Sequence, residues 1–157
     1  MTPFDDDEEL LLRQVHPKFI VEARITSQTF LPTEKDDKKL SVNRNSMISA
    51  HEAFNLHTQV KKLQSIGVWG VSVEEVKTFD SLSLESDPIE TPIQDLSHSL
   101  INFSKLSSES RIKATAKQLT AKARDRGCLY QSDDTEPDLK ADTLTPEIEA
   151  SPVGQSL

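Results

Sequence analysis

The stretch that most constrains the fold of this chain is an apolar run from Ser65 to Val73, which contains the only tryptophan, Trp69. The run is short and rich in β-branched residues, and residues that favour turns flank it, which is typical of a strand buried on both faces. Its two glycines, Gly67 and Gly70, would each cost a helix about 1 kcal/mol relative to alanine. In a strand they allow another backbone to approach closely. The sequence therefore predicts a central, buried strand here.

Signals for helices lie on both sides of this strand. Ser49 and Glu52 upstream, like Ser72 and Glu75 downstream, have the spacing of a capping box, in which each side chain bonds a free backbone N–H. Apolar residues recur at helical spacing after Ser49, and Gly67 is suited to end that helix in the left-handed conformation. The order helix, strand, helix is therefore predicted.

The remaining segments predict further elements of both kinds. Acidic residues at its start favour a short helix over 5–15. Alternating apolar and polar residues favour one long or two short strands over 19–30 and a strand over 40–44, which we expect to pair with each other. Serines and prolines predict a long loop over 80–95, followed by a strand over 97–103.

A last helix is expected to begin at Ser107 or Ser108 and to end at Gly127, before a closing strand over 128–130. Its apolar stripe would consist of Ile112, Ala116, Leu119 and Ala123. Together these elements predict an α+β fold, in which a small mixed or mostly antiparallel sheet packs against two or three helices.

The charge of the chain is concentrated at its ends. The net charge is −8, but residues 131–157 carry seven acids and one base, and residues 5–9 are all acidic. The remaining residues therefore have a net charge near +3. We expect an acidic N-terminal segment over 1–12, one α+β domain over 13–130 and a disordered acidic tail over 131–157.

Cysteine content and hydropathy indicate the cellular compartment of the protein. A single cysteine, Cys128, allows no internal disulfide and fits a reducing environment. The acidic N-terminus is unlike a signal peptide, and no apolar run approaches the roughly 20 residues of a membrane span. The sequence predicts a soluble, cytoplasmic protein with no membrane partner.

Motifs for metals and phosphates are missing from the sequence. The histidines are scattered, and His51 and His57 would lie about 240° apart around a helix, so they share no face. The Gly67-x-x-Gly70 pair lacks the third glycine and the lysine of a phosphate-binding loop. We therefore expect neither a metal nor a cofactor.

The last predicted helix is strongly basic. Its cations suggest a face that holds nucleic-acid phosphates, with a solvated helix face as the plainer alternative. The candidate nucleic-acid-binding residues are Arg111, Lys113, Lys117, Lys122, Arg124 and Arg126.

A second set of polar residues lies near the ends of predicted strands. A histidine beside a serine can activate its hydroxyl, and arginines bind anionic groups. The plainer alternative is that each serine bonds a neighbouring backbone group and each histidine packs at the surface. The catalytic candidates are His16, Ser27 and His98, and the ligand-binding candidates are Arg13, Ser41 and Arg44.

A spaced pattern runs through much of the chain. It comprises His-Pro at 16–17, Thr-Ser-Gln-x-Phe at 26–30, Leu-Ser-Val at 40–42 and Gly-Val-x-Gly-Val at 67–71. This pattern resembles one in small uncharacterised bacterial proteins, and it covers about residues 13–130. The resemblance implies a bacterial source and no particular activity.

The sequence leaves three functions open. It favours a small binding or interaction domain, most readily for a protein partner. The alternative is an enzyme, or a toxin-like transferase or hydrolase, that acts on a nucleotide-like or phosphorylated ligand. The third is a nucleic-acid-associated protein that uses the basic helix over 111–126. A cleft that joined Ser27, Ser41 and His98 to an arginine would favour the enzyme.

Overall fold

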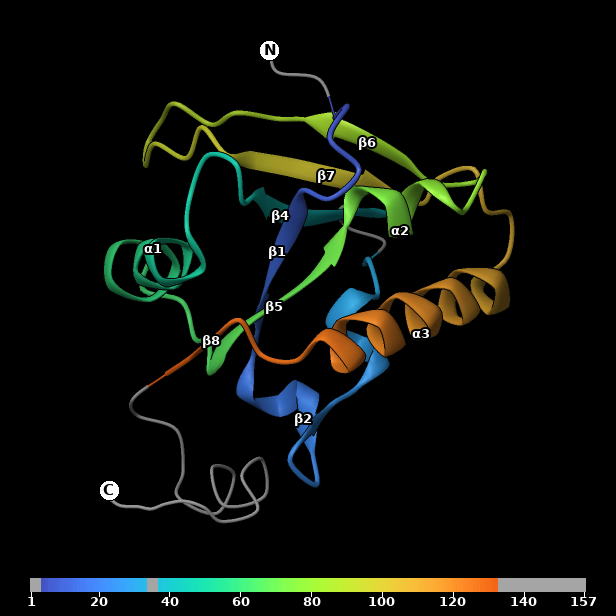
Figure 1. Cartoon of the computed structure of the whole chain (residues 1–157), viewed down its shortest axis with the longest axis horizontal. Helices are drawn as coiled ribbons and strands as arrows, with labels where there is room; N and C mark the ends of the chain where they lie inside the picture. Colours follow the sequence, from blue (N-terminus) through green and yellow to red (C-terminus); the bar gives the residue numbers. More distant parts are fainter. Residues whose placement is uncertain (1–3, 34–36, 133–157) are drawn as a thin grey trace.

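The computed structural model describes residues 4–33 and 37–132. Six strands form one sheet in the order β6-β7-β4-β1-β5-β8, and every pairing in it is antiparallel (Figure 1). The strands are β1 (Leu10–Val15), β4 (Lys39–Arg44), β5 (Gly67–Ser72), β6 (Ser83–Ser86), β7 (His98–Asn102) and β8 (Tyr130–Gln131). The predicted α+β class with a mostly antiparallel sheet is confirmed.

Helices and a small hairpin complete the fold. The helices are α1 (Ala50–Asn55), which continues as a π-helical turn over Leu56–Val60, α2 (Val73–Lys77) and α3 (Glu109–Arg126). Two 3-10 turns, η1 (Pro17–Phe19) and η2 (Ser27–Phe30), flank a separate hairpin of β2 (Ile20–Val21) and β3 (Arg24–Ile25). Both predicted capping boxes are present, with reciprocal side-chain bonds at Ser49 and at Ser72.

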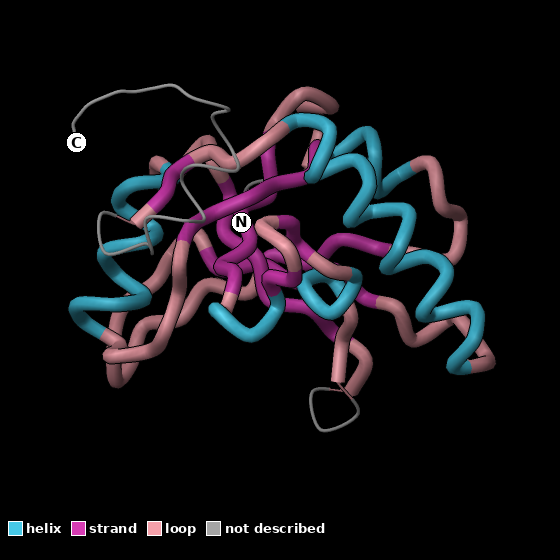
Figure 2. Tube along the Cα trace, turned by 90° about the horizontal axis from the view of Figure 1, so that it is seen from below, coloured by secondary structure: helices cyan, strands magenta, loops and turns pink. Residues whose placement is uncertain are grey.

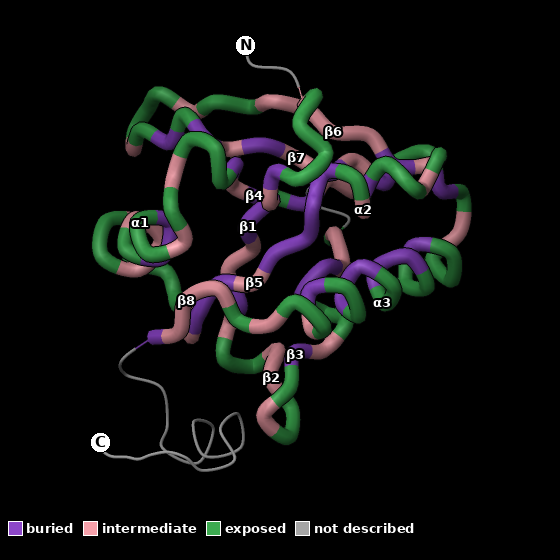
Figure 3. Tube along the Cα trace, viewed as in Figure 1, coloured by how far each residue is buried: buried purple, intermediate pink, exposed green. Residues whose placement is uncertain are grey.

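The two faces of the sheet are covered by different elements. Leu11 and Val71 lie on the face whose core includes buried residues of α3 such as Leu119. Leu12 and Val68 point the other way and pack against residues of α1. Figure 2 shows α3 and α1 flanking the strands on two sides, and Figure 3 shows buried residues along the central strands and along α3.

The helix predicted over 5–15 is wrong, because this segment forms β1, between β4 and β5 at the centre of the sheet. Its consecutive leucines do not need to share one face, since Leu11 and Leu12 enter the two opposite cores. β1 begins at Leu10, so a domain boundary placed after residue 12 would cut this strand.

The pairing predicted between 19–30 and 40–44 is also wrong. Glu22 and Ala23 have positive φ angles of 53° and 66°, and the chain turns back there as the β2–β3 hairpin. β4 pairs instead with β1 and β7. The expected loop over 80–95 includes β6, whose partner is β7.

The buried central strand predicted around Trp69 is present as β5. Gly67 does not end the preceding helix, because the left-handed residue is Lys62, with φ of 59°. Gly67 instead allows close backbone approach, since a Cβ there would lie 2.6 Å from the Tyr130 carbonyl oxygen of β8.

The expected closing strand is β8, which begins two residues later and ends one residue later than predicted. Ser132 is buried, and its N–H donates to the Ile66 carbonyl (2.9 Å). The tail predicted from 131 onward otherwise lies outside the described residues.

Candidate functional site

A pocket of about 300 Å³ lies between the β2–β3 hairpin, β5 and the C-terminal end of α3. We call it the Trp69 pocket. It is lined by Ile20, Ala23, Arg24, Ile25, Trp69, Arg124, Gly127, Cys128 and Gln131. Aliphatic side chains and one aromatic ring supply apolar surface, and two arginines supply positive charge. None of the lining residues carries a carboxylate.

Arg124 is the central polar group of this pocket. Its Nη2 donates to the Ile25 carbonyl oxygen (2.6 Å), which ties α3 to the hairpin. Its Nε is buried and has no hydrogen-bond partner among the described residues. Arg24 is exposed, and neither guanidinium forms an ion pair within the described part of the chain. Unneutralised guanidinium groups of this kind favour a carboxylate or phosphate ligand.

Cys128 lines the same pocket. Burial raises the pKa of its thiol to about 11, although backbone hydrogen bonds at Tyr130 and Val68 oppose that rise. The thiol therefore stays neutral near pH 7 and donates to the Tyr130 carbonyl (3.1 Å).

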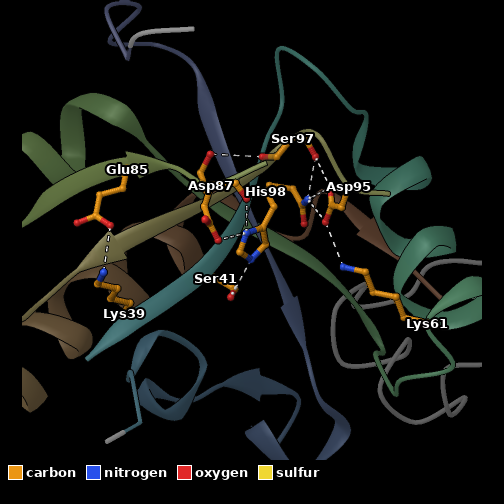
Figure 4. A network of polar contacts seen from close by, with 10 residues as sticks. Lys39, Ser41, Lys61, Glu85, Asp87, Asp95, Ser97 and His98 are labelled. Carbon is orange, nitrogen blue, oxygen red and sulfur yellow. Dashed lines mark hydrogen bonds and ion pairs between the residues drawn. The ribbon is translucent and has the colours of Figure 1, made fainter. Parts of the chain in front are cut away.

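A second polar site lies on the opposite sheet face, where β4 and β7 run side by side (Figure 4). The Ser41 hydroxyl is 3.0 Å from His98 Nε2. His98 Nδ1 lies 3.0 Å from the Asp87 carbonyl oxygen and 3.1 Å from Asp87 Oδ2. Ser41 is exposed, and the His98 side chain is 12% exposed. Ser41, His98 and Asp87 therefore contact one another in that order, and we call them the serine–histidine–aspartate series.

Asp95 fixes the loop that carries Asp87. Its carboxylate accepts bonds from Asn43 Nδ2 (2.9 and 3.0 Å), Ser97 Oγ (2.9 Å) and Lys61 Nζ (3.1 Å) (Figure 4). Burial would raise the pKa of Asp95, but these donors hold it below its ordinary value. The buried, ionised carboxylate thus joins the loop to β4 and to the residue that follows the π-helical turn.

The structure brings together two of the predicted site residues, Ser41 and His98. His16 caps η1, where its Nδ1 accepts from the Lys18 N–H, and Ser27 begins η2. Neither forms a hydrogen bond with Ser41 or His98 in the described part of the chain. The grouping of Ser27 with Ser41 and His98 that would favour an enzyme is therefore not present as a hydrogen-bonded site among the described residues.

The two predicted ligand-binding arginines are engaged within the protein. Arg13 donates through Nε to the Thr29 carbonyl (2.8 Å) and through Nη1 to the Ser41 carbonyl (3.0 Å). Arg44 is 2% exposed and is paired with Glu9, so its guanidinium is not accessible to a ligand.

The basic helix does not present its cations on one surface. At about 100° per residue, Arg111 and Lys122 fall on one flank of the buried stripe. On the other flank lie Lys113, Lys117 and Arg124. Arg126 pairs with Glu75 (2.9 Å) and donates to the Gly70 carbonyl (3.0 Å). This division gives little support to a single nucleic-acid-binding face, which stays a prediction.

Sequence reasoning missed most of the Trp69 pocket. It placed Trp69 in the core and Arg124 on a nucleic-acid face, and it gave Arg24 and Cys128 no role in a site. Ala23 has a positive φ, which bends the hairpin over the pocket. Glycine or asparagine usually signals such a turn in a sequence, and neither is present here.

No family model, curated protein or solved structure matches this chain. The resemblance to small bacterial proteins therefore stays a prediction. Among the described residues, no helix has the length and apolar character needed to cross a membrane. In the same residues, no three histidine, cysteine or acidic side chains are grouped as metal ligands.

Proposed function

We propose that this protein is a binding domain for a small anionic molecule with a planar or apolar portion, held in the Trp69 pocket. The observation that carries the proposal is the guanidinium of Arg124. It lies at a pocket without a lining carboxylate, and one of its donors has no partner in the described structure.

The chemistry of the pocket supports a ligand with two kinds of surface. A guanidinium offers donors in a planar fork that matches carboxylate and phosphate oxygens. Trp69 and Ile25 provide the apolar surface on which a flat group can pack. A nucleotide-like or phosphorylated molecule combines both features, so this class is the first to test.

The charges around the pocket favour the same class of ligand. Lys113 and Lys117 are exposed and lie on the same flank of α3 as Arg124. The acidic residues next to lining residues in sequence are Glu22, at the tip of the hairpin, and Asp125, beside Arg124; both are exposed and neither lines the pocket. A cytoplasmic location and a bacterial source, both also proposals, fit the single cysteine and the sequence pattern, respectively.

The pocket holds its own optical reporter, because Trp69 is the only tryptophan. We would titrate the protein with ATP, GMP, inorganic phosphate and citrate, and follow the Trp69 emission. At least one anion should give a saturable change. Arg124→Gln should weaken that binding about 10- to 100-fold, since a hydrogen bond to a charged group contributes about 1.5–3 kcal/mol.

Lys122→Gln is the matched control, because it removes the same charge from the same helix on the other flank. It should leave the dissociation constant within about twofold, because an exposed charge outside the pocket is largely screened. Arg24→Gln provides a second pocket variant at an exposed residue of the hairpin. The proposal fails if no anion changes the Trp69 emission, or if the Arg124 and Lys122 variants bind alike.

A further inference from the structure

The contact between Ser41 and His98 follows from the register of two neighbouring strands. Asn43 is opposite His98, and Ser41 is opposite Leu100, so Ser41 and His98 are diagonal neighbours on one face. Diagonal residues of antiparallel strands lie about 7–8 Å apart, within reach of a ring side chain. The imidazole closes that gap and places Nε2 3.0 Å from the exposed Ser41 hydroxyl (Figure 4).

The partners of His98 determine which of its nitrogens carries the proton. Nδ1 faces two acceptors, the carbonyl oxygen and the carboxylate of Asp87. An ionised carboxylate and a carbonyl only accept hydrogen bonds, so Nδ1 must donate. In the neutral ring the lone pair is then on Nε2 and points to Ser41, whose hydroxyl donates to it.

The third member of the series is held in place from several directions. The Asp87 N–H donates to the His98 carbonyl (2.9 Å), and Ile89 and Asp95 exchange two backbone bonds (3.0 and 2.7 Å). The bonds of the Asp95 carboxylate to Asn43 and Lys61 fix the far end of the same loop. Asp87 can therefore orient the imidazole and stabilise it when it becomes positively charged.

We propose that Ser41 is a nucleophile activated by His98 and that this second site accepts an acyl group from an ester that lies on the open sheet face. The Ser41 oxygen forms a bond to the acyl carbon while its proton moves to His98 Nε2. The ester C–O bond then breaks, and the leaving oxygen takes that proton. Water afterwards attacks the acyl-serine, which releases the acid and restores the hydroxyl.

One cation lies on the same face of β4 as Ser41. Lys39 is two residues before Ser41, roughly 7 Å along the strand, and its ammonium pairs with Glu85 (3.4 Å). The Glu85 carboxylate already compensates this charge, so Lys39 is assigned no role in the acyl transfer. The site is on the other sheet face from the Trp69 pocket, so neither proposal depends on the other.

The test uses p-nitrophenyl acetate with the full chain. Released p-nitrophenolate gives the rate, and peptide mapping by mass spectrometry locates the acetyl group. The wild type should acetylate at Ser41 about 10²–10⁴ times faster than an unactivated serine, the range of general base catalysis. His98→Gln should lower this rate at least about 100-fold, and Ser41→Ala should abolish the adduct.

Ser104→Ala is the matched control, because Ser104 is exposed and has no hydrogen bond to a histidine among the described residues; its rate should equal the wild-type rate. Circular dichroism verifies that each variant is folded, and Asp87→Asn replaces His98→Gln if the latter unfolds. The proposal is overturned if the wild type forms no Ser41 adduct, or if Ser41 reacts equally fast when His98 or Asp87 is replaced.

Discussion

The most informative single residue outside the two sites is Arg44. It donates to both oxygens of Glu9, at 3.0 Å from Nε and 2.6 Å from Nη2, and both side chains are at most 3% exposed. The guanidinium also lies 4.0 Å from the centre of the Phe4 ring. Such a pair does not by itself guarantee stability, but removal of one partner leaves a buried charge without compensation.

Arg44→Met should therefore destabilise the protein by about 3–5 kcal/mol, measured as the free energy of unfolding in urea. The exposed pair of Lys77 with Asp7 (3.4 Å) gives the control, because both of its side chains are about half exposed. Lys77→Met should change the free energy of unfolding by less than about 1 kcal/mol. Equal effects of the two variants would show that the Glu9–Arg44 pair is not buried in solution.

Sequence alone could not assign these residues their roles. Arg44 was a ligand-binding candidate because it lies at the end of a predicted strand, whereas its partner, Glu9, is 35 residues away. Ser41 and His98 were both named, but their contact depends on strand register, which no local pattern encodes. Asp87 gains its position only through the loop that follows β6.

At the scale of the element, the pairing of β5 with β8 depends on Gly67. A Cβ at Gly67 would lie 2.6 Å from a backbone oxygen, which cannot move without separating the strands. At Gly70 the nearest atom, at 3.0 Å, is the end of the flexible Leu129 side chain, followed by the Leu11 carbonyl oxygen at 3.1 Å.

Gly67→Ala should therefore lower the free energy of unfolding by about 1–3 kcal/mol, and by more than Gly70→Ala. Displacement of β8 should also break the hydrogen bond from the exposed Cys128 thiol to the Tyr130 carbonyl, so its reaction with a disulfide reagent should become faster in Gly67→Ala. A smaller loss in Gly67→Ala than in Gly70→Ala would mean that β8 does not pair with β5 as described.

Elements with local signals were predictable, and elements defined by distant contacts were not. Ser49, Ser72 and Ser108 each cap a helix, because capping involves residues within three positions. β5 was predictable because residues that favour turns flank its apolar run on both sides. β1 was mistaken for a helix. Three consecutive leucines after an acidic run match neither the period of 2 of a strand with one buried face nor the period of 3.6 of a helix. They fit a strand only once both faces of the sheet are known to be buried.

At the scale of the whole molecule, carboxylates connect separate parts of the fold. Glu9, just before β1, joins that strand to the last residue of β4, Glu75 joins α2 to the end of α3, and Asp95 joins a loop to β4. Burial would raise the pKa of each, but hydrogen bonds from arginine, asparagine, lysine or serine lower it below the ordinary value.

A carboxyl group whose pKa is lower in the folded state stabilises the fold above its unfolded pKa, and this contribution is lost as the pH falls through the folded value. The free energy of unfolding should therefore decrease below about pH 4.5, the ordinary range of these groups. Asp95→Asn should make this decrease shallower, as measured by urea unfolding from pH 7 to pH 3. A free energy of unfolding that stays constant from pH 7 to pH 3 would contradict the described ionic contacts.

The central position of β1 has a consequence for synthesis on the ribosome. Its main partner strand, β5, ends at Ser72, which pairs with Leu10 from 62 residues further along the chain. At about 5–20 residues per second, roughly 3–12 s pass before that partner has been translated. For that interval the leucines of the nascent β1 have no finished sheet to join, although β4, its other neighbour, is translated earlier.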